Sequence, residues 1–208
     1  MCSPAQALRS ASLAAVLLLL LRLQGGAAAA ARTCPPPCVC TGELLDCSRL
    51  RRGQMPHTIP EWTVQLDLSH NKLQMLDGTL FSKLQHLSEI KLNHNELDAI
   101  PDLGPNAANI TTLILANNRI TGVSAERLRP FAALETLDLG NNHIAEIKAN
   151  SFPALPLKNL FLNNNRISAL EIGSFSNLSG SLQVLRLNRN RLSAIPAKMF
   201  QLPNLQHL

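Results

Sequence analysis

The strongest constraint on this chain is an internal repeat in which each unit reads apolar-x-apolar-x-x-Asn-x-apolar. Six units occur in succession, with their asparagines spaced 24, 23, 24, 23 and 25 residues apart, and a seventh begins with Leu205 and Leu208. Periods of this length are typical of solenoids, in which each unit packs on its neighbours. The repeated asparagines are Asn71, Asn95, Asn118, Asn142, Asn165 and Asn190.

A single repeat is too small to fold alone. Burial of its roughly seven aliphatic residues contributes about 10–20 kcal/mol. Ordering roughly 24 residues costs more than that, at about 1–2 kcal/mol per residue for the backbone alone. Residues two apart, such as Leu66 and Leu68, point to the same side of a short strand. We therefore expect stacked repeats with one parallel sheet. Because leucine supplies 40 residues and aromatics only 3% of the chain, Leu, Ile and Val should fill its interior.

Residues 1–31 have the order of a secretory signal peptide. Arg9 precedes an apolar run over 11–21, and the small-residue tract 27–31 follows. An uncleaved signal anchor is the alternative, but the run is shorter than the roughly 20 residues of a membrane span. No other apolar run approaches that length, so membrane attachment would require segments absent from this chain. The expected location is the secretory pathway and the extracellular side of the plasma membrane, or the extracellular space if the protein has no span.

Four cysteines stand together before the first repeat, in the predicted cap segment 32–63. Their spacing is C-x3-C-x-C-x6-C, and the residues are Cys34, Cys38, Cys40 and Cys47. An even count in a secreted chain predicts disulfides, for which four cysteines allow three connectivities. A zinc site is the alternative for four close cysteines.

The repeats over 64–208 and the cysteine motif resemble extracellular leucine-rich repeat proteins. This resemblance implies an α/β-type solenoid, a horseshoe with a parallel sheet on its concave face and short helical or irregular segments on its convex side. It also implies the pairs Cys34–Cys40 and Cys38–Cys47, which close the open N-terminal end of the stack. In such proteins the repeated asparagines form an internal hydrogen-bonded ladder, because an amide both donates and accepts where the chain leaves the strand.

The sequence contains few motifs associated with catalysis, ligand binding or modification. Charged residues are 16% of the chain and the net charge is +5, which exclude intrinsic disorder and give no support to nucleic-acid binding. No hydrolase, metalloprotease, phosphate-loop or dinucleotide fingerprint occurs, so we expect no enzymatic activity, cofactor or metal. The sequons at Asn109 and Asn177 predict N-glycosylation.

Residues that alternate with the inward leucines should face outward on the concave sheet. Large apolar side chains at these positions favour a protein-binding site centred on Phe161, although single exposed apolar residues are common. Sulfated glycan binding is a second possibility, because the C-terminal end is locally basic through Arg186, Arg189 and Arg191, with Arg166 nearby. His70 and His94 should be neighbours, either as solvated surface residues or as a metal pair or pH sensor. The candidate protein-binding residues are Ile114, Phe161, Val184 and Arg186.

Several longer stretches resemble one family more specifically, the leucine-rich repeats and immunoglobulin-like domains proteins. They are LLDCSR, LDLSHNKL, IPDLGPNAANIT, LKNLFLNNNRI and LRLNRNRLSAIPAKMFQLPNLQHL. The resemblance implies a non-enzymatic cell-surface glycoprotein that modulates growth-factor receptor signalling, with receptors or growth factors as partners. The alternative is a secreted small leucine-rich matrix protein that binds matrix components or growth factors. Because the chain ends within a repeat, we expect it to be an N-terminal ectodomain fragment whose last residues, 196–208, fray.

Overall fold

The computed structural model describes residues 33–51, 53–195 and 201–208. The predicted signal peptide over 1–31 lies outside the described residues. Within the described ranges, no helix is both long enough and apolar enough to cross a membrane. The repeats and the cysteine motif form one unit, Cys34–Leu208.

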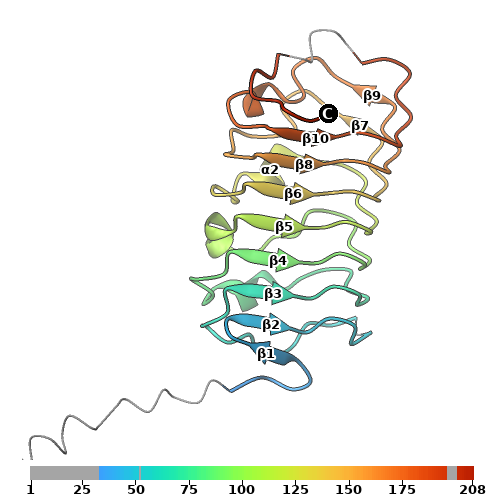
Figure 1. The fold of residues 1–208 in the computed structure, drawn as a ribbon. Helices are drawn as coiled ribbons and strands as arrows, with labels where there is room; N and C mark the ends of the chain where they lie inside the picture. The colour runs from blue at the N-terminus through green and yellow to red at the C-terminus, as the bar shows by residue number, and fades with distance from the viewer. Residues whose placement is uncertain (1–32, 52, 196–200) are drawn as a thin grey trace, which may run out of the picture. The chain divides into compact units, whose positions relative to one another are not determined.

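Two strands of the cysteine-rich cap and one strand from each of the six repeats form a single eight-stranded sheet, in the order β1-β2-β3-β4-β5-β6-β8-β10 (Figure 1). The first pair, β1 and β2, is antiparallel, and every later pair is parallel. This arrangement confirms the predicted solenoid. The strands are β1 (Val39–Thr41), β2 (Leu44–Asp46), β3 (Gln65–Asp67), β4 (Glu89–Lys91), β5 (Thr112–Ile114), β6 (Thr136–Asp138), β8 (Asn159–Phe161) and β10 (Val184–Arg186).

The repeat positions stay in register across the whole sheet. Leu66 of β3 pairs with Ile90 of β4, which pairs with Leu113 of β5, and all three are buried. Flanking strand residues are half-buried or exposed, because alternate side chains point to opposite faces. The strands therefore present one apolar face to the interior and one face to solvent, which we call the sheet face.

The segments that lead from one strand of the eight-stranded sheet back to the next, here called return segments, contain only short elements. β7 (Glu146–Ile147) and β9 (Ala169–Leu170) form a two-stranded parallel sheet. The helical turns are η1 (Gly78–Phe81), η2 (Pro105–Asn109), α2 (Ala125–Leu128) and η3 (Ser176–Leu178). These elements match the short helical and irregular side that the resemblance implied.

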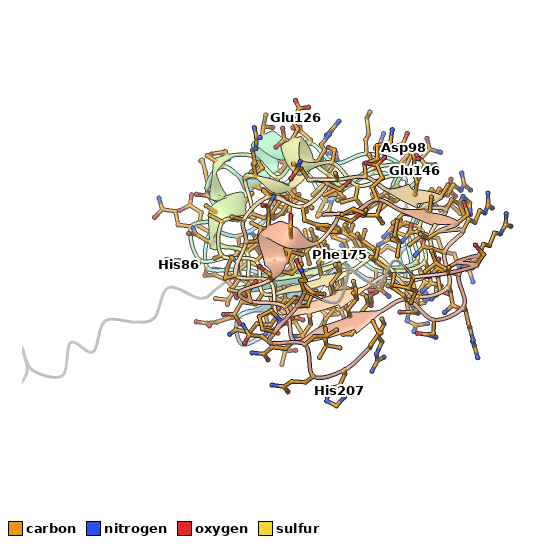
Figure 2. The ribbon with its side chains drawn as sticks, turned by 90° about the horizontal axis from the view of Figure 1, so that it is seen from above. His86, Asp98, Glu126, Glu146, Phe175 and His207 are labelled. Atoms are coloured by element: carbon orange, nitrogen blue, oxygen red, sulfur yellow. A yellow bond between two sulfur atoms is a disulfide. The ribbon has the colours of Figure 1, made fainter. Side chains whose placement is uncertain are left out.

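Phenylalanines fill part of the interior, which the expectation of a purely aliphatic core missed. Phe81, Phe131, Phe152 and Phe175 are all buried, and the rings of Phe152 and Phe175 stack with centroids 5.6 Å apart. Figure 2 looks along the stack and places Phe175 inside, whereas His86, Glu126 and His207 lie at the periphery. These four rings lie in four different segments between strands of the sheet, and the segment between β4 and β5 has none.

The irregular stretch IPDLGPNAANIT brings two return segments into close contact at a pair of glycines. Gly104 has φ +68°, and a Cβ there would lie 3.0 Å from the carbonyl oxygen of Gly78. A Cβ on Gly78 would in turn meet the carbonyl oxygen of Asp102 at 3.2 Å. Glycine tolerates both the left-handed backbone and the close approach, so this stretch departs from the other repeats for a steric reason.

The N-terminal end is closed by disulfides between Cys34 and Cys40 and between Cys38 and Cys47. This pairing is the one that the resemblance implied, and it leaves no free thiolate in the motif for zinc. Cys47 is buried at the interior position that Leu68 takes in the next repeat. The cap thus continues the core while its antiparallel strand β1 covers the edge of β2, an edge that would otherwise be open to pairing.

The seventh unit continues the sheet beyond β10. Val184 forms a parallel bridge with His207, and the Leu185 N–H donates to the carbonyl oxygen of His207 at 2.9 Å. Leu202 is buried, whereas Leu208 is 60% exposed. The expected fraying over 196–208 stays a prediction, and residues 196–200 lie outside the described residues.

Candidate protein-interaction surface

The repeated asparagines hold the turns that follow each strand. Nδ2 of Asn142 donates to the carbonyl oxygens of Leu115 and Leu139, and Oδ1 accepts from the Ile120 N–H at 3.0 Å. The Asn142 side chain is buried. It therefore supplies hydrogen bonds to backbone N–H and C=O groups of neighbouring repeats at the point where the chain leaves the sheet. The other ladder positions donate from Nδ2 in the same way, at Asn71, Asn95, Asn118, Asn165 and Asn190.

The residue before each ladder asparagine adopts a left-handed backbone, which sequence reasoning did not predict. Asn141, for example, has φ +55°, and its N–H donates to the carbonyl oxygen of Asn163 in the next repeat. Asparagine adopts this conformation more readily than most residues, so the doubled asparagines of the middle repeats were the available signal. The six positions are His70, His94, Asn117, Asn141, Asn164 and Arg189, and Arg49 has the same backbone at the equivalent place in the cap.

Asn141→Val should destabilise the protein by about 1–2 kcal/mol, because a β-branched residue is strained at positive φ. The Asn141 side chain is exposed, so little packing is lost. Guanidinium unfolding measures the change, and Asn141→Gly is the matched control, which should stay within about 0.5 kcal/mol of the parent. Equal losses in both variants would contradict a backbone origin.

Three aspartates at the centre of the sheet face serve their own turns. Oδ1 of Asp46, Asp67 and Asp138 accepts the N–H two residues later, each at 2.8 Å. Burial raises the pKa of Asp138 above its ordinary value, and the Gly140 N–H and the Arg186 charge oppose that rise. These carboxylates are therefore partly engaged in holding the turns.

The candidate binding residues come together only in part. Phe161 and Arg186 are register partners, and the guanidinium carbon of Arg186 lies 5.0 Å from the centroid of the Phe161 ring. Val184 stands two residues before Arg186 on the same strand and face. Ile114 lies two strands from Phe161, with Asp138 between them. The arrangement is a half-buried aromatic ring under a cation and beside an acid, with Ile114 one strand farther away. Aromatic rings and arginine are enriched at protein interfaces.

The two neighbouring histidines stack on each other. The ring centroids of His70 and His94 are 4.1 Å apart with an interplanar angle of 13°. Burial, the His70 ring and the Arg49 charge lower the pKa of His94 below its ordinary 6.5. Within the described chain, no group of three or more His, Cys, Asp or Glu is placed to hold a metal ion.

His70→Asn should raise the pKa of His94, because the substitution removes one of the groups that disfavour its protonation. The sign also applies to stability: with a folded pKa below the unfolded value, His94 stabilises the fold above pH 6.5 and loses that contribution as the pH falls. A proton NMR titration of His94 in parent and variant measures the shift. An unchanged or lower pKa in the variant would contradict the assignment.

Comparison with known proteins identifies the family. Two leucine-rich repeat family models match, one described as leucine rich repeat over 64–103 and 155–208, the other as leucine rich repeats in two copies over 108–154. Leucine-rich repeats and immunoglobulin-like domains protein 3 of Homo sapiens is 55% identical over 175 residues, which are 84% of this chain and 16% of that protein. The chain belongs to the leucine-rich repeats and immunoglobulin-like domains family.

Further matches agree with this membership. Leucine-rich repeats and immunoglobulin-like domains protein 1 of Homo sapiens is 42% identical over 176 residues, again 84% of this chain and 16% of that protein. The crystal structure of a TLR13–ssRNA13 complex superposes with a TM-score of 0.64 at 32% identity, covering 70% of this chain and 21% of that one. The chain thus spans about a sixth of the length of these family relatives. It is a non-enzymatic, extracellular protein-interaction module.

The sequon asparagines of this family member lie at the return side of the repeats. Asn109 ends η2 and Asn177 lies within η3, and both residues are exposed. Nδ2 of Asn109 donates to the carbonyl oxygen of Gln85, and Nδ2 of Asn177 donates to that of Phe152, each at 3.0 Å. An N-linked glycan leaves one hydrogen on Nδ2, so glycosylation at both sites stays a prediction that is compatible with these contacts.

Proposed function

We propose that this chain is the partner-binding repeat segment of a cell-surface glycoprotein that modulates growth-factor receptor signalling, and that it binds through the sheet face. Membership of the leucine-rich repeats and immunoglobulin-like domains family supports the receptor-regulator role. The Phe161–Arg186 contact is the observation that supports a binding site on this face.

The chemistry of this part of the sheet face suits a protein partner. Phe161 is half-buried on a rigid strand, so a partner gains apolar contact without ordering a loop. Arg186 lies over that ring and is exposed, with its hydrogen-bond donors available to a partner carboxylate. Asp138 is the register partner of Phe161 on the other side and supplies the opposite charge. An acidic, an aromatic and a basic side chain thus follow one another across three strands.

Phe161→Ala should weaken partner binding at least about tenfold, because buried aromatic anchors dominate interface energies. The measurement is biosensor binding of the full chain to purified ectodomains of receptor tyrosine kinases and bone morphogenetic protein receptors. Ile172→Ala is the control, since Ile172 is an exposed apolar residue outside the eight-stranded sheet. A Phe161→Ala variant that binds a receptor as tightly as the parent would remove this site from consideration.

The secreted matrix protein is the competing function. It predicts binding of the chain to matrix components or free growth factors and no binding to receptor ectodomains. The same biosensor series, extended to collagen and soluble growth factors, distinguishes the receptor-modulating function from the matrix-binding function.

A further inference from the structure

We propose that one edge of the eight-stranded sheet binds a sulfated glycosaminoglycan chain that runs along the stack of repeats, across the strands. This edge is formed by the third and fifth residues after each strand of the parallel sheet, from β2 to β10, and we call it the exit edge. Its third positions are Arg49, His70, His94, Asn117, Asn141, Asn164 and Arg189, and its fifth positions are Arg51, Lys72, Glu96, Arg119, His143, Arg166 and Arg191.

Backbone hydrogen bonds keep the side chains of the exit edge in rows. At the third positions, the N–H of Arg49, His70 and His94 each donates to a carbonyl of the following repeat, at 2.9–3.0 Å. At the fifth positions, the N–H of Arg166 and Arg191 each donates to a carbonyl of the preceding repeat, at 2.8–2.9 Å. Neighbouring repeats are about 4.8 Å apart, so the two rows extend over roughly 30 Å. Such rows match a long, linear ligand better than a compact one.

The exit edge carries seven arginines and lysines and one acid: five of the cations stand at fifth positions, and Arg49 and Arg189 stand at the two ends of the row of third positions. All the arginines and lysines of the exit edge are exposed, and its single acid, Glu96, is paired with Arg119 at 3.2 Å. None of the other cations of the exit edge takes part in an ion pair within the described residues. The positions just before the strands lack this bias, because they carry Glu43, Glu135 and Lys158, the last two paired at 2.8 Å. The charge is therefore concentrated on one edge rather than spread evenly over the module.

The backbone at the third positions also favours a functional role for two arginines of the exit edge. Asparagine suits the left-handed backbone at the third positions, and the middle repeats use it. Arg49 and Arg189 occupy the same backbone at φ +58° and +57°, where arginine is less favourable. A less favourable residue at a recurring position points to a role outside the fold. Between Arg49 and Arg189, the side-chain amides of the asparagines in the middle repeats add neutral hydrogen-bond donors along the row of third positions.

The ligand class follows from charge and compartment. A row of cations and amide donors fits a polyanion whose sulfate groups recur along a chain. Disulfide bonds place the module in an oxidising, extracellular setting, where sulfated glycosaminoglycans are the abundant linear polyanions. The exit edge carries no Phe, Tyr or Trp on which bases could stack, and two of its three histidines, His70 and His94, already stack on each other. This disfavours single-stranded nucleic acid.

The test is heparin binding by the full chain, produced through the secretory pathway so that the disulfides form. The parent should bind a defined heparin fragment at about 0.15 M salt, and desulfated heparin should not bind. The triple variant Arg166→Gln, Arg189→Asn, Arg191→Gln should bind at least about tenfold more weakly and show a shallower salt dependence, since fewer counterions are released. Arg189→Asn restores the residue type of the middle repeats, so the backbone should tolerate it.

A matched control removes the same net charge elsewhere. The triple variant Lys83→Gln, Arg127→Gln, Arg129→Gln changes exposed cations of the return segments and should keep parental affinity. A second exit-edge variant, Arg49→Asn with Lys72→Gln, tests the other end of the rows and should also weaken binding. Equal losses in control and exit-edge variants would overturn the proposal, as would absence of heparin binding by the parent. Tighter exit-edge binding of a single-stranded RNA of matched charge would overturn the choice of ligand.

Discussion

Asn142→Ala should lower the free energy of unfolding by about 2–4 kcal/mol, one of the two largest effects expected for this protein. The substitution leaves the buried Ile120 N–H without its acceptor, at a cost of about 1–3 kcal/mol. The carbonyls of Leu115 and Leu139 each lose one of two amide donors, because Asn118 and Asn165 still donate to them. Urea unfolding measures the loss, and hydrogen exchange of the Ile120 amide should accelerate.

The shared carbonyls make neighbouring ladder positions interdependent. In the double variant Asn142→Ala, Asn165→Ala, the carbonyl of Leu139 loses both amide donors, so the loss should exceed the sum of the single losses by roughly 1 kcal/mol. Asn95→Ala with Asn142→Ala is the matched control, because these two side chains share no carbonyl, and its losses should add. Additive losses of unfolding free energy in both pairs would show that each asparagine stabilises its own turn independently of its neighbours.

Phe152→Ala should destabilise the protein by about 3–5 kcal/mol, because a fully buried ring is replaced by a cavity. The ring stacks on Phe175, and the carbonyl oxygen of Phe152 accepts from Asn177, so the cavity would also loosen the contact between two return segments. Guanidinium unfolding measures the change, and hydrogen exchange over Ser176–Leu178 should report the local loosening.

Phe161→Ala is the matched control for this core substitution. The same atoms are removed from the sheet face, where the ring is half exposed, so the loss should stay below about 1 kcal/mol. A loss at Phe161 as large as that at Phe152 would mean that Phe161 is a packing residue, and its role in partner binding would lose its basis.

The repeat pattern was sufficient to predict most of the architecture. Its period predicted the stack, the paired aliphatics predicted the short parallel strands, and the framed asparagines predicted where each turn lies. Resemblance supplied the disulfide pairing, which the spacing of four cysteines leaves open. The stack, the strands and the turns depend on residues close in sequence or on a repeated position, so the repeat pattern identifies all three.

The candidate site was less predictable. Strand alternation placed Phe161 and Arg186 on one face, but their contact depends on the register between β8 and β10. Ile114 lies two strands from Phe161 with Asp138 between them, as the order of the repeats requires. The buried phenylalanines went unpredicted because overall aromatic content says little about where a few rings lie.

The sequence by itself determined the solenoid, its period, the interior aliphatic positions and the turns held by asparagine, because stacking of identical units repeats every local preference. Only the tertiary structure decided which of the outward neighbours make contact, such as Arg186 with Phe161 and Arg119 with Glu96. The cations of the exit edge are scattered through the chain at intervals of a repeat, and none forms a charge cluster in sequence near the middle of the stack. Register between repeats brings equivalent positions to about 4.8 Å spacing, and this turns isolated residues into continuous rows.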